Sequence, residues 1–150
     1  MTKDEYKQEI EKHIVEVKGL LLIAIKELLK KANRHDASKL QSPEIDLFSK
    51  YIPELAKIQY GSKQYKQALK KLRPALDHHY AKNAHHPNHY VKGIKGMNLF
   101  DLVEMICDWI SSAKRHQTGD VKQSIILNQK RFGYSDDLKL ILFNTLKVLK

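Results

Sequence analysis

Residues 77–90 read DHHYAKNAHHPNHY, and this stretch holds five of the eight histidines of the chain. Imidazole is the commonest metal-binding side chain, and it also changes charge near neutral pH. A cluster this dense indicates a metal site, provided that other segments supply carboxylates. The alternative is a histidine-rich surface loop without a function.

The stretch begins on a predicted helix and ends in a loop. Apolar residues recur at helical spacing before the histidines, at Tyr65, Leu69, Leu72 and Leu76. The same spacing continues into His79, so we expect His79 to point towards the core and His78 to be rotated by about 100°. Pro74 is predicted to break or kink this helix, and Pro87 disfavours helical backbone at His86.

Length and composition predict a single domain over residues 1–150, with a core of its own. The one cysteine, Cys107, cannot form an internal disulfide, which favours a reducing compartment. The charged N-terminus is unlike a signal peptide, and the apolar run Leu20 to Ile25 is too short to span a bilayer. We therefore expect a cytoplasmic protein that does not enter a membrane.

The formal net charge is +10 with histidine counted as neutral. Such an excess favours polyanionic partners such as nucleotides, nucleic acid or acidic lipid, so the expected ligand is a phosphate-bearing molecule. The alternative is that the lysines only cover solvent-facing sides of helices.

Helical periodicity and capping residues predict an all-α bundle of about six or seven helices. Thr2 and Glu5 have capping-box spacing, and their helix is expected to run towards Lys31. Ser42-Pro43 is predicted to start a second helix, which ends before Pro53. Later helices are expected to begin after Gly61-Ser62, Asn98, Gly119-Asp120 and Ser135.

A second informative stretch is NRHDASKL at 33–40, in which His35 and Asp36 are adjacent. An imidazole nitrogen and a carboxylate oxygen can bind one cation, in a mixed set suited to Zn, Mn or Fe. Lys39 follows Asp36 by three residues, which on a helix places its ammonium over the same face.

Three acidic residues share one side of the helix expected from Leu99 to Arg115. Asp101, Glu104 and Asp108 lie within about 60° of one another on a helical wheel. An acidic stripe usually faces water. The competing interpretation is that these carboxylates face a cation bound by the histidines.

Together these motifs resemble those of a known superfamily. His13, then His35-Asp36, then the histidines of 78–86, then Asp108 follow the order of the HD-domain metal-dependent phosphohydrolases. More narrowly, the chain resembles a family of small phage and bacterial HD-like proteins. The matching segments, within residues 13 to about 134, are HDASK at 35–39, HHxxxNxHHP at 78–87 and DLVEMxxDW at 101–109.

The resemblance implies an HD-domain-like helical bundle around one or two divalent ions, with Mn, Fe, Co, Ni, Zn and Mg as candidates. The ligands that it implies are His13, His35, Asp36, His79, His85, His86 and Asp108. In this interpretation Asp36 is able to bridge two ions, and His79 with His85 or His86 holds the second ion.

His13 departs from the superfamily pattern, in which the first histidine lies on a helix separate from the His-Asp helix. Here 22 residues separate His13 from His35, with only Gly19 to interrupt the apolar stripe. An unbroken helix would hold them about 33 Å apart. Either the chain turns near Lys30 to Asn33, or His13 is an ordinary helix histidine and no ligand.

The predicted activity is that of a metal-dependent phosphohydrolase, a phosphatase or phosphodiesterase that acts on a nucleotide or related phosphate ester. Metal-activated water would be the nucleophile. Lys39 and Arg34 would bind the phosphate, and Glu104 would orient or deprotonate the water. The alternative is a basic module that binds nucleic acid or protein and has a structural or vestigial metal cluster. The substrate, the number of ions and the oligomeric state stay open at this point.

Overall fold

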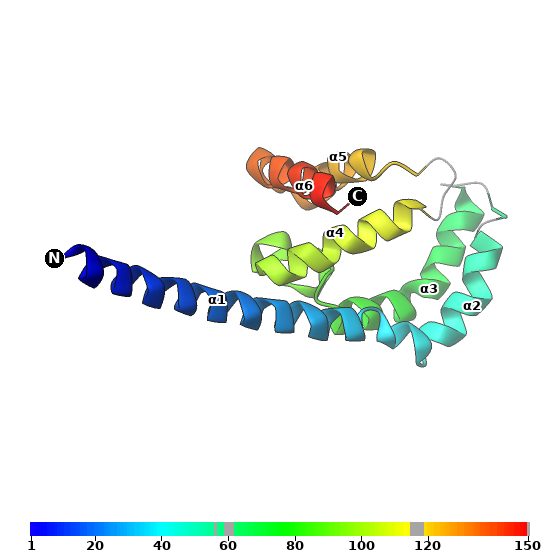
Figure 1. The fold of residues 1–150 in the computed structure, drawn as a ribbon. Coiled ribbons are helices and arrows are strands. Elements are labelled where there is room, and N and C mark those ends of the chain that lie inside the picture. Colours follow the sequence, from blue (N-terminus) through cyan, green and yellow to red (C-terminus); the bar gives the residue numbers. More distant parts are fainter. Residues whose placement is uncertain (56, 59–61, 115–118, 150) are drawn as a thin grey trace. The chain divides into compact units, whose positions relative to one another are not determined.

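The computed structural model describes residues 1–55, 57, 58, 62–114 and 119–149. This part of the chain holds six α-helices, three short 3-10 helices and no strand (Figure 1). The all-α prediction is therefore confirmed. The chain divides into two units, Met1–Arg34 and His35–Lys150.

The N-terminal unit is one helix, α1 (Lys3–Arg34). The predicted capping box is present: Thr2 N–H donates to Glu5 Oε2 at 2.7 Å, and Glu5 N–H donates to Thr2 Oγ1 at 3.2 Å. A turn near Lys30 to Asn33, which was one of the two alternatives for His13, is absent, because these residues are helical. Apart from Asn33 they are good helix formers, and no Gly or Pro lies near enough to stop the helix.

No residue of α1 is buried, and most of its apolar stripe is exposed, at Ile10, Ile14, Val17, Leu21 and Ile25. Among the described residues, no helix combines the length and the apolar character needed to cross a bilayer.

The second unit begins with η1 (Ala37–Leu40), followed by α2 (Glu44–Leu55), which packs against α3 (Lys63–Lys82). Ser62 caps α3 by accepting the Tyr65 N–H at 3.0 Å. The buried residues of α3 are Ala68, Leu72, Ala75 and His79. This face is rotated from the predicted stripe but still includes Leu72 and His79, because the small residues Ala68 and Ala75 are buried instead of Leu69 and Leu76.

Two prolines lie inside these helices. The prediction that the helix ends before Pro53 was wrong, and so was the break that was one of the two outcomes predicted at Pro74. α2 continues through Pro53 to Leu55, and α3 continues through Pro74 to Lys82. A proline removes one backbone hydrogen bond and disturbs the carbonyl one turn earlier. Buried residues on both sides of Pro74, at Leu72 and Ala75, hold α3 in place. The start of α2 is Glu44, one residue later than expected.

Two 3-10 helices, η2 (Pro87–His89) and η3 (Gly93–Gly96), precede α4 (Leu99–Lys114), α5 (Val121–Phe132) and α6 (Asp136–Val148). The predicted N-caps Asn98, Asp120 and Ser135 each accept a backbone N–H. Buried side chains from these elements form one core: Ile94, Met105, Ile106, Ile125, Tyr134, Leu142 and Leu146. Full burial of a large apolar side chain contributes about 1.5–3 kcal/mol, so this core anchors α4 and its acidic face.

Candidate metal centre

The side chains of several predicted metal ligands converge on Asp36, and the backbone of Asp36 is unusual. It precedes η1 in a left-handed conformation, with φ 55° and ψ 14°. Few residues other than glycine adopt this conformation, although Asp and Asn tolerate it better than most. Such strain is concentrated at functional sites, where the surrounding structure must hold it.

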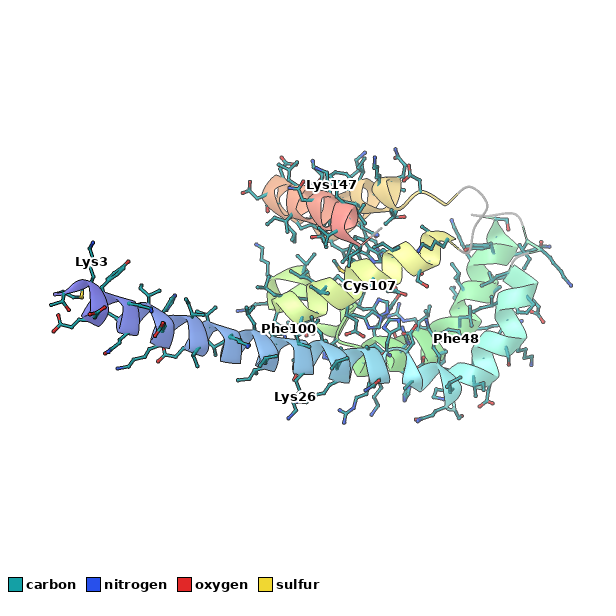
Figure 2. All side chains as sticks on the ribbon, viewed as in Figure 1. Lys3, Lys26, Phe48, Phe100, Cys107 and Lys147 are labelled. Atoms are coloured by element: carbon teal, nitrogen blue, oxygen red, sulfur yellow. The ribbon has the colours of Figure 1, made fainter. Side chains whose placement is uncertain are left out.

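Imidazole nitrogens from three segments surround the Asp36 carboxylate. The Nε2 atoms of His79 and His85 lie 3.5 and 3.6 Å from Asp36 Oδ1, and His35 Nε2 lies 3.5 Å from Oδ2. His86 Nε2 is 2.8 Å from His79 Nε2. Figure 2 shows nitrogen-bearing side chains gathered between α3 and α4, with Phe48 of α2 labelled beside them.

α4 contributes two further carboxylates, on either side of the His35 ring. Glu104 Oε1 is 2.9 Å from His35 Nδ1 and 3.1 Å from His85 Nδ1. Asp108 Oδ1 is 3.8 Å from His35 Nε2. Asp101 belongs to the N-terminal cap of α4 instead, since its Oδ2 accepts the N–H of Asn98 and the O–H of Tyr90. Of the predicted acidic stripe, two members therefore face histidines.

Buried polar atoms without a hydrogen-bond partner lie at the centre of the cluster. Among the described residues they are Asp36 Oδ1 and both ring nitrogens of His85, whose approach to Glu104 lacks hydrogen-bond geometry. An unpaired buried polar group costs about 1–3 kcal/mol. Two atoms bound to one ion at about 2.0–2.2 Å are at most about 4.4 Å apart, and the separations around Asp36 Oδ1 are shorter. The side chains therefore fit a divalent cation.

The donors form three overlapping groups, in each of which the ligand atoms lie within 4.8 Å of one another. The groups are Asp36 with His79, His85 and His86; His35 with His85 and Glu104; and His35 with Asp36 and Asp108. Asp36, His35 and His85 each belong to two groups. A mixed set of imidazoles and carboxylates suits Zn, Mn or Fe.

The protonation states also suit a cation. Burial lowers the pKa of His86 to about 3. Burial likewise lowers the pKa of His79, against the opposing effect of its hydrogen bond to Glu44. Burial alone would raise the pKa of Asp36, but the hydrogen bond and charge of Lys39, together with interactions with His35 and His79, outweigh it and hold that pKa below its usual value. Neutral imidazoles and an ionised carboxylate are the forms that bind metals.

A pocket of about 460 Å³ adjoins the cluster and is lined by Lys39, His79 and His86. The Lys39 ammonium lies 2.5 Å from Asp36 Oδ2. The other walls come from α2 and α3, at Ile45, Phe48, Ser49, Ile52, Leu76 and Tyr80. A ligand in this pocket would meet both apolar side chains and candidate metal ligands.

A family model described as a family of unknown function, DUF5662, matches residues 2–148. The chain belongs to this family. Comparisons with curated proteins and with solved structures gave no match. The family's description names neither HD-domain phosphohydrolases nor phage proteins, so the function must be argued from the geometry of the cluster.

Six of the predicted metal ligands lie together in the second unit, at His35, Asp36, His79, His85, His86 and Asp108. Lys39 and Glu104 contact members of this set. His13 and Arg34 belong to α1, in the N-terminal unit. Because α1 does not turn, about 31 Å of helix separates His13 from Arg34. The sequence left two alternatives for His13. The alternative in which His13 is a metal ligand required a turn of the chain between His13 and His35, and α1 has no such turn.

No sequence signal points to a partner for His89 or His116. In the structure, His89 Nδ1 donates to the Tyr80 carbonyl oxygen at 2.8 Å, and the side chain is exposed. His116 lies outside the described residues.

Sequence reasoning missed Glu44, which is fully buried beside His78 and His79. The only signal was an acid in the first turn of a predicted helix, which has an ordinary explanation in the helix dipole. It also gave no role to Asn83, whose Nδ2 donates to Ser38 Oγ and to the His79 carbonyl, both at 2.8 Å.

Proposed function

We propose that this protein is a metal-dependent phosphohydrolase that acts on a nucleotide or a related phosphate ester. The main observation in favour is the convergence of imidazoles and carboxylates on Asp36, next to a pocket that Lys39 also lines. The order of these motifs along the chain also supports the proposal, because it resembles that of the HD-domain phosphohydrolases.

A divalent ion held by these side chains supplies activation of water and neutralisation of phosphoryl charge. Asp36 would hold it together with His79, His85 and His86, or with His35 and Asp108. The Glu104 carboxylate contacts His35 Nδ1, which orients that ring with its Nε2 towards Asp36 and Asp108. In the same interpretation Glu104 is the group that orients the attacking water or takes its proton.

Lys39 would bind the phosphate, because it contacts Asp36 in the cluster and also lines the pocket. A positive charge held there favours the negative charge that develops on a transferring phosphoryl group. The apolar walls of the pocket would receive the organic part of the ester. Structural metal sites are closed by protein ligands, whereas catalytic sites keep a position open, and a pocket beside His79 and His86 suits the second kind.

The first test is elemental analysis of the purified protein, followed by a panel of phosphatase and phosphodiesterase substrates with Mn, Fe, Co, Ni, Zn and Mg. We expect bound divalent metal and turnover of a small phosphate ester, with both lost in Asp36→Asn. Metal-free protein that gains no activity with any of these ions would contradict the proposal.

The second candidate is a basic module that binds nucleic acid, with a structural or vestigial cluster. The net charge of +10 favours it. Binding to DNA or RNA through phosphate contacts would weaken steeply with salt, because counterions are released. Tight, salt-sensitive binding without turnover in any metal would favour this candidate. Weak binding with turnover of a small ester would favour the enzyme.

A further inference from the structure

Glu44 is a fully buried acidic residue at the start of α2, with no exposed surface. Each of its carboxylate oxygens contacts a histidine: Oε1 is 2.7 Å from His78 Nδ1, and Oε2 is 2.8 Å from His79 Nδ1. A buried carboxylate is costly unless it is hydrogen-bonded. These two contacts therefore explain how the charge is tolerated.

The two short contacts decide the direction of both hydrogen bonds, because each oxygen of the Glu44 carboxylate faces one imidazole Nδ1, at 2.7 and 2.8 Å. An ionised carboxylate only accepts hydrogen bonds, so Nδ1 of both histidines carries a hydrogen.

Asn83 leaves this arrangement undisturbed. Its Nδ2 lies 3.0 Å from His79 Nδ1, but the two hydrogens of that amide are directed to Ser38 Oγ and to the His79 carbonyl. His79 Nδ1 is thus free to donate to Glu44.

With its hydrogen on Nδ1, a neutral His79 presents the Nε2 lone pair. That atom lies 3.5 Å from Asp36 Oδ1 and 2.8 Å from His86 Nε2. We propose that Glu44 is a positioning residue, which fixes the tautomer and the ring orientation of His79 so that Nε2 serves as a metal ligand. His78 supplies the second donor and completes the pairing of the buried carboxylate.

Glu44 differs in this respect from Glu104, which contacts His35 Nδ1 in a similar way. Glu104 belongs to one of the candidate donor groups and so can bind an ion directly, whereas Glu44 belongs to none of the groups found among the described residues. An effect of Glu44 on metal affinity would therefore act through His79. This inference rests on the proposed metal binding.

The test uses the full chain stripped of metal with a chelator and titrated with Mn²⁺ or Zn²⁺ alone. Loss of a partner that orients a metal-binding histidine typically weakens metal affinity about 10–100-fold. We expect a loss of that size in Glu44→Leu, which removes both acceptors. Glu44→Gln retains one acceptor and should fall between Glu44→Leu and wild type.

His78→Gln is the matched control, because it changes the other partner of Glu44 and its amide N–H can still donate to Oε1. We expect its metal affinity to stay within about threefold of wild type, well inside the 10–100-fold range. A loss as large as that of Glu44→Leu would overturn the proposal, since it would mean that any disturbance near the buried carboxylate has the same effect.

The tautomer can be read without metal, from the ¹⁵N chemical shifts of the His79 ring in the chelated protein. We expect a hydrogen on Nδ1 in wild type and His78→Gln, and a hydrogen on Nε2 in a measurable fraction of the Glu44 variants. An unchanged tautomer with wild-type affinity in a folded Glu44 variant would overturn the proposal. If Glu44→Leu does not fold, Glu44→Gln decides. If wild type binds no metal, the proposed function fails, while the tautomer result still tests the role of Glu44.

Discussion

His85 Nε2 and Asp36 Oδ1 lie 3.6 Å apart, and both atoms are buried without a hydrogen-bond partner. The separation is too long for a hydrogen bond and short enough for both atoms to bind one ion. His79 Nε2 faces the same oxygen at 3.5 Å. The arrangement thus costs free energy in the protein alone and becomes favourable when a cation joins these atoms.

Asp36→Asn should abolish metal binding without unfolding the protein. Asparagine tolerates the left-handed backbone of residue 36 about as well as aspartate, so the change removes the charge but not the conformation. We expect affinity for Mn²⁺ to fall by more than about 100-fold, beyond the effect of losing a supporting partner. Calorimetric titration measures this, and circular dichroism checks the fold.

Asp46→Asn provides the control, because Asp46 is an exposed acid in the first turn of α2. Its affinity should equal that of wild type. Equal affinity in Asp36→Asn as well would show that the cluster does not bind metal through Asp36.

Lys39→Met should tighten metal binding and slow turnover. The Lys39 ammonium lies 2.5 Å from Asp36 Oδ2 and competes with a cation for that carboxylate. We expect about a tenfold gain in affinity, in keeping with the modest energies of partly exposed charges. We also expect a lower kcat/KM for a phosphate ester, because a phosphate-binding charge is lost.

Lys139→Met is matched in chemistry and spacing, since Lys139 lies 2.5 Å from Asp136, also three residues away. This pair belongs to α6, so Lys139→Met should change neither the metal affinity nor kcat/KM. Weaker metal binding in Lys39→Met than in Lys139→Met would contradict the expected competition.

The sequence correctly predicted those helix caps and side-chain directions that depend on residues close together along the chain. The capping box of Thr2 and Glu5 and the cap of α4 by Asn98 depend on hydrogen bonds spanning two or three residues. The inward direction of His79 follows from helical spacing, because α3 keeps its period through Pro74. The prolines were misjudged because local preference opposes a helix there, and only packing within the folded unit outweighs it.

Glu44 could not be found from the sequence, because its partners lie 34 and 35 residues later along the chain. No spacing rule joins an acid in the first turn of one helix to histidines near the end of the next. The sequence also could not show which carboxylates of the acidic stripe face the histidines, for a similar reason. Asp101 and Glu104 are adjacent on one helix face, but Tyr90 and His35, from different segments, decide which of them joins the cluster.

The metal-free protein should lose stability as the pH falls from about 6.5 towards 4.5. The pKa of His86 is about 3 in the folded state and about 6.5 in an unfolded chain. The unfolded state therefore binds more protons in this range, so acid favours unfolding. The stabilisation is fully present above about pH 6.5, and up to about 2.7 kcal/mol is lost by pH 4.5.

Urea denaturation in the presence of a chelator, repeated across this pH range, measures the effect. His86→Gln should flatten the pH dependence, although His79, whose pKa is also lowered by burial, retains part of it. His89→Gln should leave the slope unchanged, because His89 is exposed. Identical slopes in wild type and His86→Gln would contradict the assignment to His86.

Replacing single histidines separates the cluster from the rest of the stretch 77–90. His79→Ala removes a candidate ligand and leaves the buried Glu44 Oε2 without its donor. We expect loss of metal-dependent activity and a destabilisation of about 2–4 kcal/mol, because a buried charge loses a partner. His89→Ala removes one exposed hydrogen bond to Tyr80, so it should cost at most about 1 kcal/mol and leave metal content unchanged. His116→Ala is a second control, and it should change neither the metal-dependent activity nor the stability.

Metal content by elemental analysis, turnover and urea denaturation distinguish the three variants. Equal metal content and equal activity in all of them would mean that the histidine-rich stretch is only a polar loop.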